Sequence, residues 1–418
     1  MPTEMIKLFM VFSPTTFQNY FKSHDELDLR SKILSLCGDV LGGKWADLHP
    51  DHVLITHMRG GLTNLVYLVT RPKFSPSDDQ PATVLLRIQS QTDHEKLLNE
   101  LVVFTSLAEN GLGPKLLGIF PGGRFEEYIP SRHVEHHEVT DSRTCTLLAR
   151  VLPRFHATAV PISKRPTLLS MMREWLALFE EQGSSHVKMR TTSFQLPPNT
   201  FPSVVSTSEL AREIDLIEEF LATGPSPVVF CHNDLTSGNL LLSTKSSTGV
   251  TPTIAEKISL NENTKDKDRE VTLNLVDFEF STYNYRGFDL ANYFCAAAIE
   301  HNLREFPHYK IDLTKLQNRS RKLEFCREYV KEAKKLNIPI QSEYSLLREI
   351  NQFAPIVHLF WAIFNLYCEK VSTYTTDMKL IFVARPSFQD TLAIMDCGAY
   401  ARDRLALYYQ SRSILLDR

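Results

Sequence analysis

The residues best suited to chemistry in this chain are His232, Asp234 and Asn239, which follow a short apolar run at residues 228–230. Their pattern, His-x-Asp-x-x-x-x-Asn, is typical of a phosphotransferase catalytic loop. Transfer of a phosphoryl group to a hydroxyl needs a carboxylate that orients the nucleophile and accepts its proton, and Asp234 is the candidate. Asn239 is the candidate oxygen ligand for Mg²⁺, and His232 is expected to fix the loop. Taken alone, the pattern also fits a strand end that caps a helix.

A second acidic motif, Asp277-Phe278-Glu279, follows the apolar residues 275–276. It is similar to the Asp-Phe-Gly motif with which kinases bind the metal that bridges the nucleotide phosphates. We therefore expect Asp277 to bind Mg²⁺ and Glu279 to add a second carboxylate to an all-oxygen ligand set. The two motifs occur in the order that kinases show, so chance is a poor explanation for the pair.

The N-terminal third carries groups suited to binding phosphate. Gly60 and Gly61 lie at the predicted tip of a hairpin, where backbone N–H groups can approach a phosphate. Thr63 and Asn64 add hydrogen-bond donors beside them. As an isolated feature this segment is equally typical of an ordinary turn, and it gains meaning only beside the other motifs.

Arg87 lies within the apolar residues 84–88, at the place where a protein kinase has its phosphate-pairing lysine. A guanidinium can bind a phosphate through two hydrogen bonds and stays charged. Glu100, in the next predicted helix, is the expected ion-pair partner. The alternative is an arginine at a strand edge and a solvated glutamate.

Hydrophobic periodicity predicts an α+β chain with a β-rich lobe at residues 1–128 and a larger helical lobe at residues 129–418. Strands are expected at 53–58, 65–69, 83–88, 116–120 and 124–129. Helices are expected at 27–41, 92–111, 147–156, 168–181, 209–222, 323–336, 346–367 and 398–416. Only two short strand-like runs, 228–230 and 273–276, interrupt the later helices. Residues 243–270, rich in Ser, Thr, Lys, Asp and Asn, are predicted to be a solvated loop.

The composition excludes several classes of protein. The chain has 46 Lys and Arg against 49 Asp and Glu, a net charge of −3, so we expect no nucleic-acid partner. Its seven cysteines include no CxxC pair, which argues against a redox pair or a zinc site. Residues 38–44 have P-loop spacing, but Trp45 follows where Ser or Thr is needed. The most apolar helical stretch, residues 353–368, is too short for a membrane span, so we expect a cytoplasmic protein.

Two longer segments carry a family resemblance. Residues 230–234 read Phe-Cys-His-Asn-Asp, and residues 275–289 read Leu-Val-Asp-Phe-Glu-Phe-Ser-Thr-Tyr-Asn-Tyr-Arg-Gly-Phe-Asp. Together they resemble the choline/ethanolamine kinase family, and choline kinases more than ethanolamine kinases. Residues 111–116 and 128–132 also match that family. The resemblance extends from about residue 59 to the last predicted helix.

This resemblance implies a bilobal, protein-kinase-like fold and a homodimer. It implies that ATP and Mg²⁺ are used to phosphorylate choline or ethanolamine, the first step toward phosphatidylcholine and phosphatidylethanolamine. The implied roles are the base at Asp234, magnesium ligands at Asn239, Asp277 and Glu279, the phosphate contact at Arg87, and an adenine pocket lined by Glu127 and Arg132.

The predicted acceptor pocket departs from the family pattern. A quaternary ammonium is best held by aromatic faces and a nearby carboxylate. Where choline kinases read Phe-Cys-Glu-Trp, this chain reads Phe-Cys-Ala-Ala at residues 294–297, so a carboxylate and an aromatic ring are missing. One interpretation is a pocket rebuilt with Glu300 and the aromatic residues Phe280, Trp361, Phe364 and Tyr400. The alternative for Trp361 and Phe364 is packing in the core.

We interpret the chain as a choline kinase that makes phosphocholine, with ethanolamine as a poorer or alternative acceptor. Two other hypotheses stay open at this point. One is a non-catalytic nucleotide-binding paralogue that regulates a true choline kinase, and the other is a kinase for another small alcohol. Retention of Asp234, Asn239 and Asp277 together favours an enzyme, and the altered acceptor residues keep the alternatives open.

Overall fold

The computed structural model describes residues 26–46, 48–58, 64–72, 80–89, 94–197, 199–244, 271–374 and 395–416. Contacts within the chain divide it into two compact units. Unit 1 comprises Met1–Arg132, Val160–Ile162 and Leu241–Glu279. Unit 2 comprises His133–Ala159, Ser163–Leu240 and Phe280–Arg418. The lobe boundary predicted at residues 128/129 stays a prediction.

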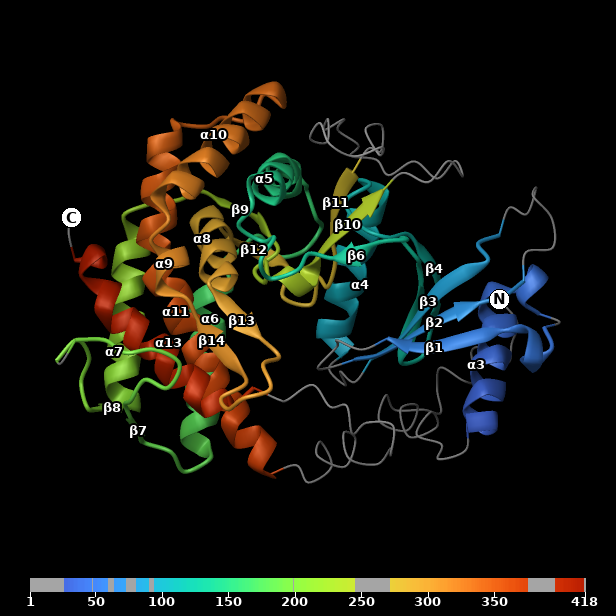
Figure 1. Ribbon diagram of the computed structural model, residues 1–418, viewed down its shortest axis with the longest axis horizontal. Helices are drawn as coiled ribbons and strands as arrows, with labels where there is room; N and C mark the ends of the chain where they lie inside the picture. The colour runs from blue at the N-terminus through green and yellow to red at the C-terminus, as the bar shows by residue number, and fades with distance from the viewer. Residues whose placement is uncertain are drawn as a thin grey trace. The chain divides into compact units, whose positions relative to one another are not determined.

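Unit 1 is built on an antiparallel sheet of five strands in the order β1-β2-β3-β5-β4 (Figure 1). The strands are β1 (Leu54–Met58), β2 (Asn64–Thr70), β3 (Thr83–Gln89), β4 (Leu116–Phe120) and β5 (Gly123–Glu127). Alternate residues of β3, Val84, Leu86 and Ile88, are buried, as the period of two in a strand requires. They pack against Ile33 and Cys37 of helix α3 (Glu26–Leu41).

A helix, two 3₁₀ turns and a second sheet accompany the five-stranded sheet. Helix α4 (His94–Glu109) is terminated by the turn at Gly111, whose φ of 66° is the left-handed conformation that favours glycine. The N–H of Leu112 donates to the carbonyl of Leu107 at 2.8 Å. Two 3₁₀ turns are η1 (Gly43–Trp45) and η2 (Pro50–His52). A separate three-stranded sheet has the order β11-β10-β6, formed by β11 (Val271–Leu275), β10 (Leu240–Thr244) and β6 (Arg132–His133).

Unit 2 is mainly helical, and its longest helix, α11 (Glu343–Tyr374), lies at its centre. Residues 356–363 of α11 are all buried, because α6, α8, α10 and α13 pack around them. A helix that is apolar on every side belongs in such a core. The other helices are α5 (Ser142–Ala157), α6 (Leu168–Glu181), α7 (Thr207–Ala222), α8 (Arg286–Ala297), α9 (Leu313–Leu316), α10 (Arg319–Lys335) and α13 (Cys397–Ser411), with 3₁₀ turns η3 (Ser237–Asn239) and η5 (Arg412–Leu415).

Unit 2 also contains three small antiparallel sheets of two strands each. The pairs are β9 (Val228–Cys231) with β12 (Thr282–Tyr285), β13 (Ile299–His301) with β14 (Tyr309–Ile311), and β7 (His186–Lys188) with β8 (Val204–Ser206). The expectation that only two strand-like runs interrupt the helices was therefore wrong. A strand of three or four residues shows too little alternation to be recognised in a sequence, and its partner is set by tertiary packing.

Most of the larger predicted elements are confirmed, with their ends shifted by a few residues. The predicted N-terminal hairpin is β1 and β2, and the second predicted hairpin is β4 and β5. Gly60, Gly61 and Thr63 lie outside the described residues, as do residues 245–270 of the predicted loop, and Asn64 is the first residue of β2. Of the helices in the described ranges, none combines the length and the apolar character needed to cross a membrane.

Candidate active site

The turn after β9 brings two of the predicted catalytic residues together. The amide Nδ2 of Asn239 donates to the carboxylate Oδ2 of Asp234 at 2.9 Å and to its backbone carbonyl at 2.8 Å. Both residues belong to unit 2, so this geometry lies within one compact body. Because the amide nitrogen of Asn239 is used in this way, its Oδ1 is the atom available to a metal ion. A carboxylate and an amide oxygen side by side are the ligand types that Mg²⁺ prefers.

The backbone of this turn is held in an uncommon conformation at Asn233, where φ is 65°. A non-glycine residue in this region persists only when its surroundings determine it. The side-chain amide of Asn233 donates to the carbonyl of Phe280 at 2.9 Å and to Oγ1 of Thr282 at 3.1 Å. Its Oδ1 accepts from Asn284 at 2.9 Å. The neighbouring strand β12 therefore fixes the conformation that presents Asp234.

The turn after β9 is also held by a buried carboxylate, Asp289, which lies in the first turn of α8. It accepts from the backbone N–H of His232 at 2.9 Å and of Asn233 at 2.7 Å. Its Oδ2 also lies 3.0 Å from Nε2 of His156, whose Nδ1 is 2.8 Å from the hydroxyl of Tyr329. Asp289 thus holds the backbone of the turn that presents Asp234, and three segments of unit 2 meet at it.

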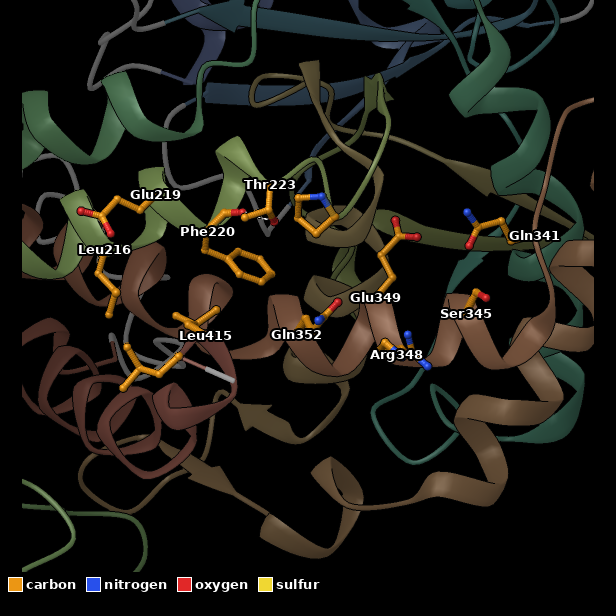
Figure 2. A pocket seen from close by; sticks show the side chains of 12 residues that line it. Leu216, Glu219, Phe220, Thr223, Gln341, Ser345, Arg348, Glu349, Gln352 and Leu415 are labelled. Atoms are coloured by element: carbon orange, nitrogen blue, oxygen red, sulfur yellow. Dashed lines mark hydrogen bonds between the residues drawn. The ribbon is translucent and has the colours of Figure 1, made fainter. Parts of the chain in front are cut away.

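The start of α8 is itself held by an ion pair. Arg286 donates to Glu349 of α11 through Nη2 at 2.6 Å and Nε at 3.1 Å. Glu349 also accepts from Ser226 at 2.7 Å. Glu349 also lines a cavity of about 410 Å³ between α7 and α11. Figure 2 shows its side chain there beside that of Phe220. The predicted catalytic residues are absent from the lining of this cavity, so it is a separate feature of unit 2.

Unit 1 contains the second predicted acidic motif. Asp277 has a φ of 66°, so this residue also adopts the left-handed conformation. Its carboxylate Oδ1 lies 3.5 Å from Nη1 of Arg87 in β3. The structure therefore brings together the predicted metal ligand and the predicted phosphate-binding arginine. Glu279 is exposed in the turn two residues further on.

Arg87 is part of a buried charge network. In the pairing of β3 with β5 it lies directly opposite Arg124, and Glu126 accepts from Arg87 at 2.9 Å and from Arg124 at 2.8 Å. Arg124 also donates to Glu100 at 2.8 Å. The predicted pair of Arg87 with Glu100 is therefore a network in which Glu126 and Arg124 stand between them. The two carboxylates neutralise the two guanidinium groups. Such pairing is needed because an unpaired charge is costly to bury.

The charges in this network shift the pKa of Glu126. Burial alone would raise its pKa, but the charges and hydrogen bonds of Arg87 and Arg124 hold it below the usual value. Burial likewise opposes the charge of Arg87, and the carboxylates of Glu126, Asp277 and Glu100 outweigh it, so the pKa of Arg87 lies above its usual range. Arg87 is therefore a permanent cation beside Asp277.

Phe278, the middle residue of the acidic motif, is buried against the loop after α4. A Cβ added to Gly113 would lie 3.0 Å from Cε2 of Phe278, so a larger residue there would require the ring to shift by a few tenths of an ångström. The ring of Phe104 lies 6.5 Å from that of Phe278. The guanidinium of Arg124 lies over the ring of Phe104, with its Cζ 4.5 Å from the ring centre. Gly113, in the segment at residues 111–116, therefore packs directly against the acidic motif.

The two residues expected to line an adenine pocket are placed on β5 and β6. Glu127 ends β5, where its backbone N–H donates to the carbonyl of Lys115 at 2.9 Å and its carboxylate accepts from the N–H of Lys115 at 3.1 Å. Arg132 begins the short strand β6 and is exposed. Their predicted role in binding adenine stays a prediction.

Three of the four predicted acceptor residues form one aromatic cluster in unit 2. The ring of Phe280 lies 5.5 Å from Trp361 and 5.8 Å from Phe364, and Trp361 lies 5.6 Å from Phe364, all edge to face. Nε1 of Trp361 donates to Asn292 of α8 at 2.7 Å. Trp361 is buried, whereas Phe280 and Phe364 are half-buried.

Tyr400 is placed differently from these three rings. It packs with Tyr309 at 5.1 Å and His301 at 5.7 Å, in a cluster that also contains Ile299. The guanidinium of Arg404 lies over its ring, with Cζ 5.1 Å from the ring centre. Glu300, the predicted replacement carboxylate, is exposed on β13.

The fold combines a β-sheet unit with a helical unit. The candidate site has a turn on which Asn239 contacts Asp234 and an acidic motif whose Asp277 lies beside Arg87. These features define the class of phosphotransferases with a protein-kinase-like fold. Solved structures agree on the fold: a choline kinase from Cryptosporidium parvum superposes with a TM-score of 0.65 at 20% identity, covering 93% of this chain and 96% of its own. An ethanolamine kinase from Plasmodium vivax gives 0.62 at 17% identity, covering 97% and 96%.

Sequence comparison gives the family. The choline/ethanolamine kinase family profile matches residues 55–409. "Choline kinase A2" of Caenorhabditis elegans is 33% identical over 396 residues, covering 93% of this chain and 87% of the relative. The human "Choline/ethanolamine kinase" is 33% identical over 357 residues, covering 83% and 82%. The chain belongs to the choline/ethanolamine kinase family, so the predicted family, fold class and enzyme class are confirmed.

Sequence reasoning missed several residues that organise the site. Glu126 and Arg124 were not singled out, although their alternation on β5 places both side chains on the face that carries Arg87. Asp289 belonged to the matched segment but received no role. His156, 76 residues before His232, gave no local signal, because only the tertiary fold brings it to Asp289.

Proposed function

We propose that this protein transfers the γ-phosphoryl group of ATP to the hydroxyl of choline, with ethanolamine as an alternative acceptor. Family membership supports the reaction class, and the product class is phosphocholine, a precursor of phosphatidylcholine. The observation that carries the proposal is the contact between Asn239 and Asp234 at 2.9 Å, on a turn anchored by Asp289. A chain that had lost catalysis would be under no constraint to keep this geometry.

In the proposed mechanism Asp234 is the base. Its carboxylate orients the acceptor hydroxyl and accepts its proton as the oxygen attacks the γ-phosphorus, while the bond from that phosphorus to the β,γ-bridging oxygen breaks and ADP leaves. Asn239 holds Asp234 through Oδ2, which restricts the carboxylate to one orientation. The strained backbone at Asn233 and its partners on β12 pre-organise the turn, so that little rearrangement is needed during reaction.

Membership of a kinase family implies ATP and a divalent metal ion. We propose Mg²⁺, held by Asp277, Glu279 and Oδ1 of Asn239, because these are all hard oxygen ligands. When bound there, the ion would neutralise charge on the phosphates. We propose that the guanidinium of Arg87 binds a phosphate oxygen, a role supported by its distance of 3.5 Å from Asp277.

The remaining nucleotide contacts are proposed from the family resemblance. The segment of Gly60, Gly61, Thr63 and Asn64 would cover the phosphates through backbone N–H groups. Glu127 and Arg132 would lie beside adenine. The same resemblance favours a homodimer, which light scattering coupled to size exclusion would measure directly.

The test is ADP release by the purified protein with Mg²⁺-ATP and a panel of choline, ethanolamine and the mono- and dimethylated ethanolamines. We expect acceptor-dependent turnover that an aminoglycoside or a sugar does not support. ATP binding is measured in parallel by calorimetry. Tight ATP binding without turnover on any acceptor would refute the proposal in favour of a non-catalytic regulator, and turnover on sugars alone would refute it in favour of another kinase.

A further inference from the structure

Helix α8 presents a second buried side chain to the turn that presents Asp234 (the catalytic turn), and the proposed mechanism does not use it. This residue, Asn292, is fully buried. Its Nδ2 donates to the backbone carbonyl of Asn233 at 3.3 Å. Asp289, on the same face of the helix, accepts from the backbone N–H of Asn233 at 2.7 Å. Helix α8 therefore holds both backbone polar groups of the residue directly before Asp234.

The amide oxygen of Asn292 is bonded to one of the predicted acceptor residues. Its Oδ1 accepts from Nε1 of Trp361, on α11, at 2.7 Å. The N–H of a buried indole usually has a partner, and the direction of this bond restricts how the ring is turned. A single amide group therefore joins an aromatic residue of α11 to the turn that carries Asp234.

A second route connects the same ring with the same turn. The side-chain amide of Asn233 donates to the carbonyl of Phe280 at 2.9 Å, and the ring of Phe280 lies 5.5 Å from that of Trp361. The residues Asn233, Phe280, Trp361 and Asn292 thus form a closed network of contacts. All four belong to unit 2, so the network lies within one compact body. A buried network in which the polar groups are paired is rigid, because no member can shift without disturbing its neighbours.

We infer that Asn292 is a positioning residue that sets the place of the acceptor-binding rings relative to Asp234. This inference rests on the proposed function and on the predicted role of Phe280 and Trp361 as acceptor residues. The faces of such rings attract an ammonium group, while Asp234 orients the hydroxyl at the other end of the acceptor. The separation of the rings from the carboxylate must therefore match the length of the acceptor. A misplacement of about 1 Å in such an arrangement can lower the rate by about a hundredfold.

A double-mutant cycle isolates the contact between Asn292 and Trp361. Asn292→Ala removes both hydrogen bonds of the amide, Trp361→Phe removes the N–H donor and keeps an aromatic ring, and a double variant carries both changes. Tyr293→Phe, at the next position of α8, is the matched control, because it removes a different buried hydrogen bond, from the tyrosine hydroxyl to the carbonyl of Val139. For each variant, phosphocholine formation gives kcat and the KM values for choline and Mg²⁺-ATP, and urea denaturation gives the folded fraction.

We expect Asn292→Ala to lower kcat by about tenfold, with the KM for Mg²⁺-ATP changed by less than about twofold. Trp361→Phe should lower kcat by about fourfold, and the double variant should fall no more than about twofold below Asn292→Ala, because the contact is already lost there. Tyr293→Phe should keep kcat within about twofold of the wild type, whatever its loss of stability. This pattern separates positioning from a structural role, since a role in stability alone lowers the folded fraction and leaves kcat per folded molecule unchanged.

A kcat for Asn292→Ala within about threefold of the wild type, or effects that multiply in the double variant, would overturn the inference. If Asn292→Ala does not fold, Trp361→Phe decides: a fall in kcat of about threefold or more with an unchanged KM for Mg²⁺-ATP supports the inference, and a smaller fall overturns it. Failure of the proposed function is distinguishable, because the wild type would then phosphorylate none of the acceptors while it still binds ATP.

Discussion

Two regions of unit 2 differ in whether their buried charged groups have partners. Around the catalytic turn, the buried Asp289 is matched by donors from His232, Asn233 and His156. Around the predicted acceptor residues, the buried Arg404 has no carboxylate partner in the described part of the chain, and one of its nitrogen atoms is without any hydrogen bond. The contrast shows that the turn presenting Asp234 is held by fully paired buried groups, whereas the region of Tyr400 contains a buried arginine without such a partner.

The charge network of unit 1 follows the same rule as the catalytic turn. Its two arginines, Arg87 and Arg124, are matched by Glu126 and Glu100 with contacts of 2.8 to 2.9 Å. Because each charge is paired, the network tolerates burial and holds Arg87 beside Asp277. Replacing one charged residue of such a network lowers the free energy of unfolding by more than the loss of its own contacts, because its partner is left buried and unpaired.

The largest effect is expected from Asp234→Asn, which removes the proposed base without changing the shape of the side chain. We expect kcat to fall by about 10² to 10⁴, with the Kd for ATP changed by less than about threefold. Asp215→Asn, an exposed carboxylate on α7, is the matched control. Steady-state ADP release and calorimetry measure the two quantities, and a kcat within fivefold of wild type would remove Asp234 from the mechanism.

Asp289→Asn should have the next largest effect. An amide offers one acceptor oxygen where the carboxylate offers two, so an N–H of the catalytic turn loses its partner. We expect kcat to fall by about 10- to 100-fold and the free energy of unfolding by about 2 kcal/mol. Urea denaturation and turnover are measured on the same sample. Loss of stability with unchanged kcat would show that Asp289 supports the fold without positioning the turn.

A smaller effect is expected from changing Arg87. Arg87→Met leaves Glu126 with one cation and removes the proposed phosphate contact, so we expect the KM for ATP to rise by about tenfold, with the KM for the acceptor little changed. Arg87→Lys should recover part of the loss, because it restores a charge but not two parallel hydrogen bonds. An equal rise in both KM values would argue for general misfolding in unit 1.

The pH dependence of stability gives the smallest of these signals. The pKa of Glu126 is lower in the folded protein than in the unfolded chain, so its stabilisation is present above an unfolded value of about 4.3 and is lost as the pH falls through the folded value. Glu126→Gln should therefore lower Tm by a few degrees at pH 7. The difference in Tm from the wild type should shrink below about pH 4, whereas a difference that stayed constant down to pH 3 would contradict the assignment.

The sequence was sufficient for the residues that act locally and insufficient for those that act through tertiary contacts. Asp234 and Asn239 lie five residues apart in one motif, and their predicted proximity is confirmed by a contact of 2.9 Å. The antiparallel N-terminal hairpins were predicted because each is continuous in sequence. Glu126 and Asp289 could not be assigned roles, since their partners are 39 and 56–57 residues away and are chosen by packing.

The predicted acceptor residues show the same limit of prediction from sequence. Trp361 and Phe364 were correctly grouped with Phe280, because residues three apart share one face of a helix. Tyr400 was expected beside them, yet its ring packs with Tyr309 under the guanidinium of Arg404. Nothing in the spacing of residues 397–404 shows that an arginine there points inward, because most arginines on a helix are exposed.

The claim that transfer to an amino alcohol is intact is tested most directly by ³¹P NMR of the wild-type protein incubated with Mg²⁺-ATP and choline. We predict a new phosphomonoester resonance that grows in step with loss of the γ-phosphate signal, and that vanishes when the divalent metal is chelated. Inorganic phosphate as the sole product, or an unchanged ATP spectrum from protein that binds ATP, would contradict the account.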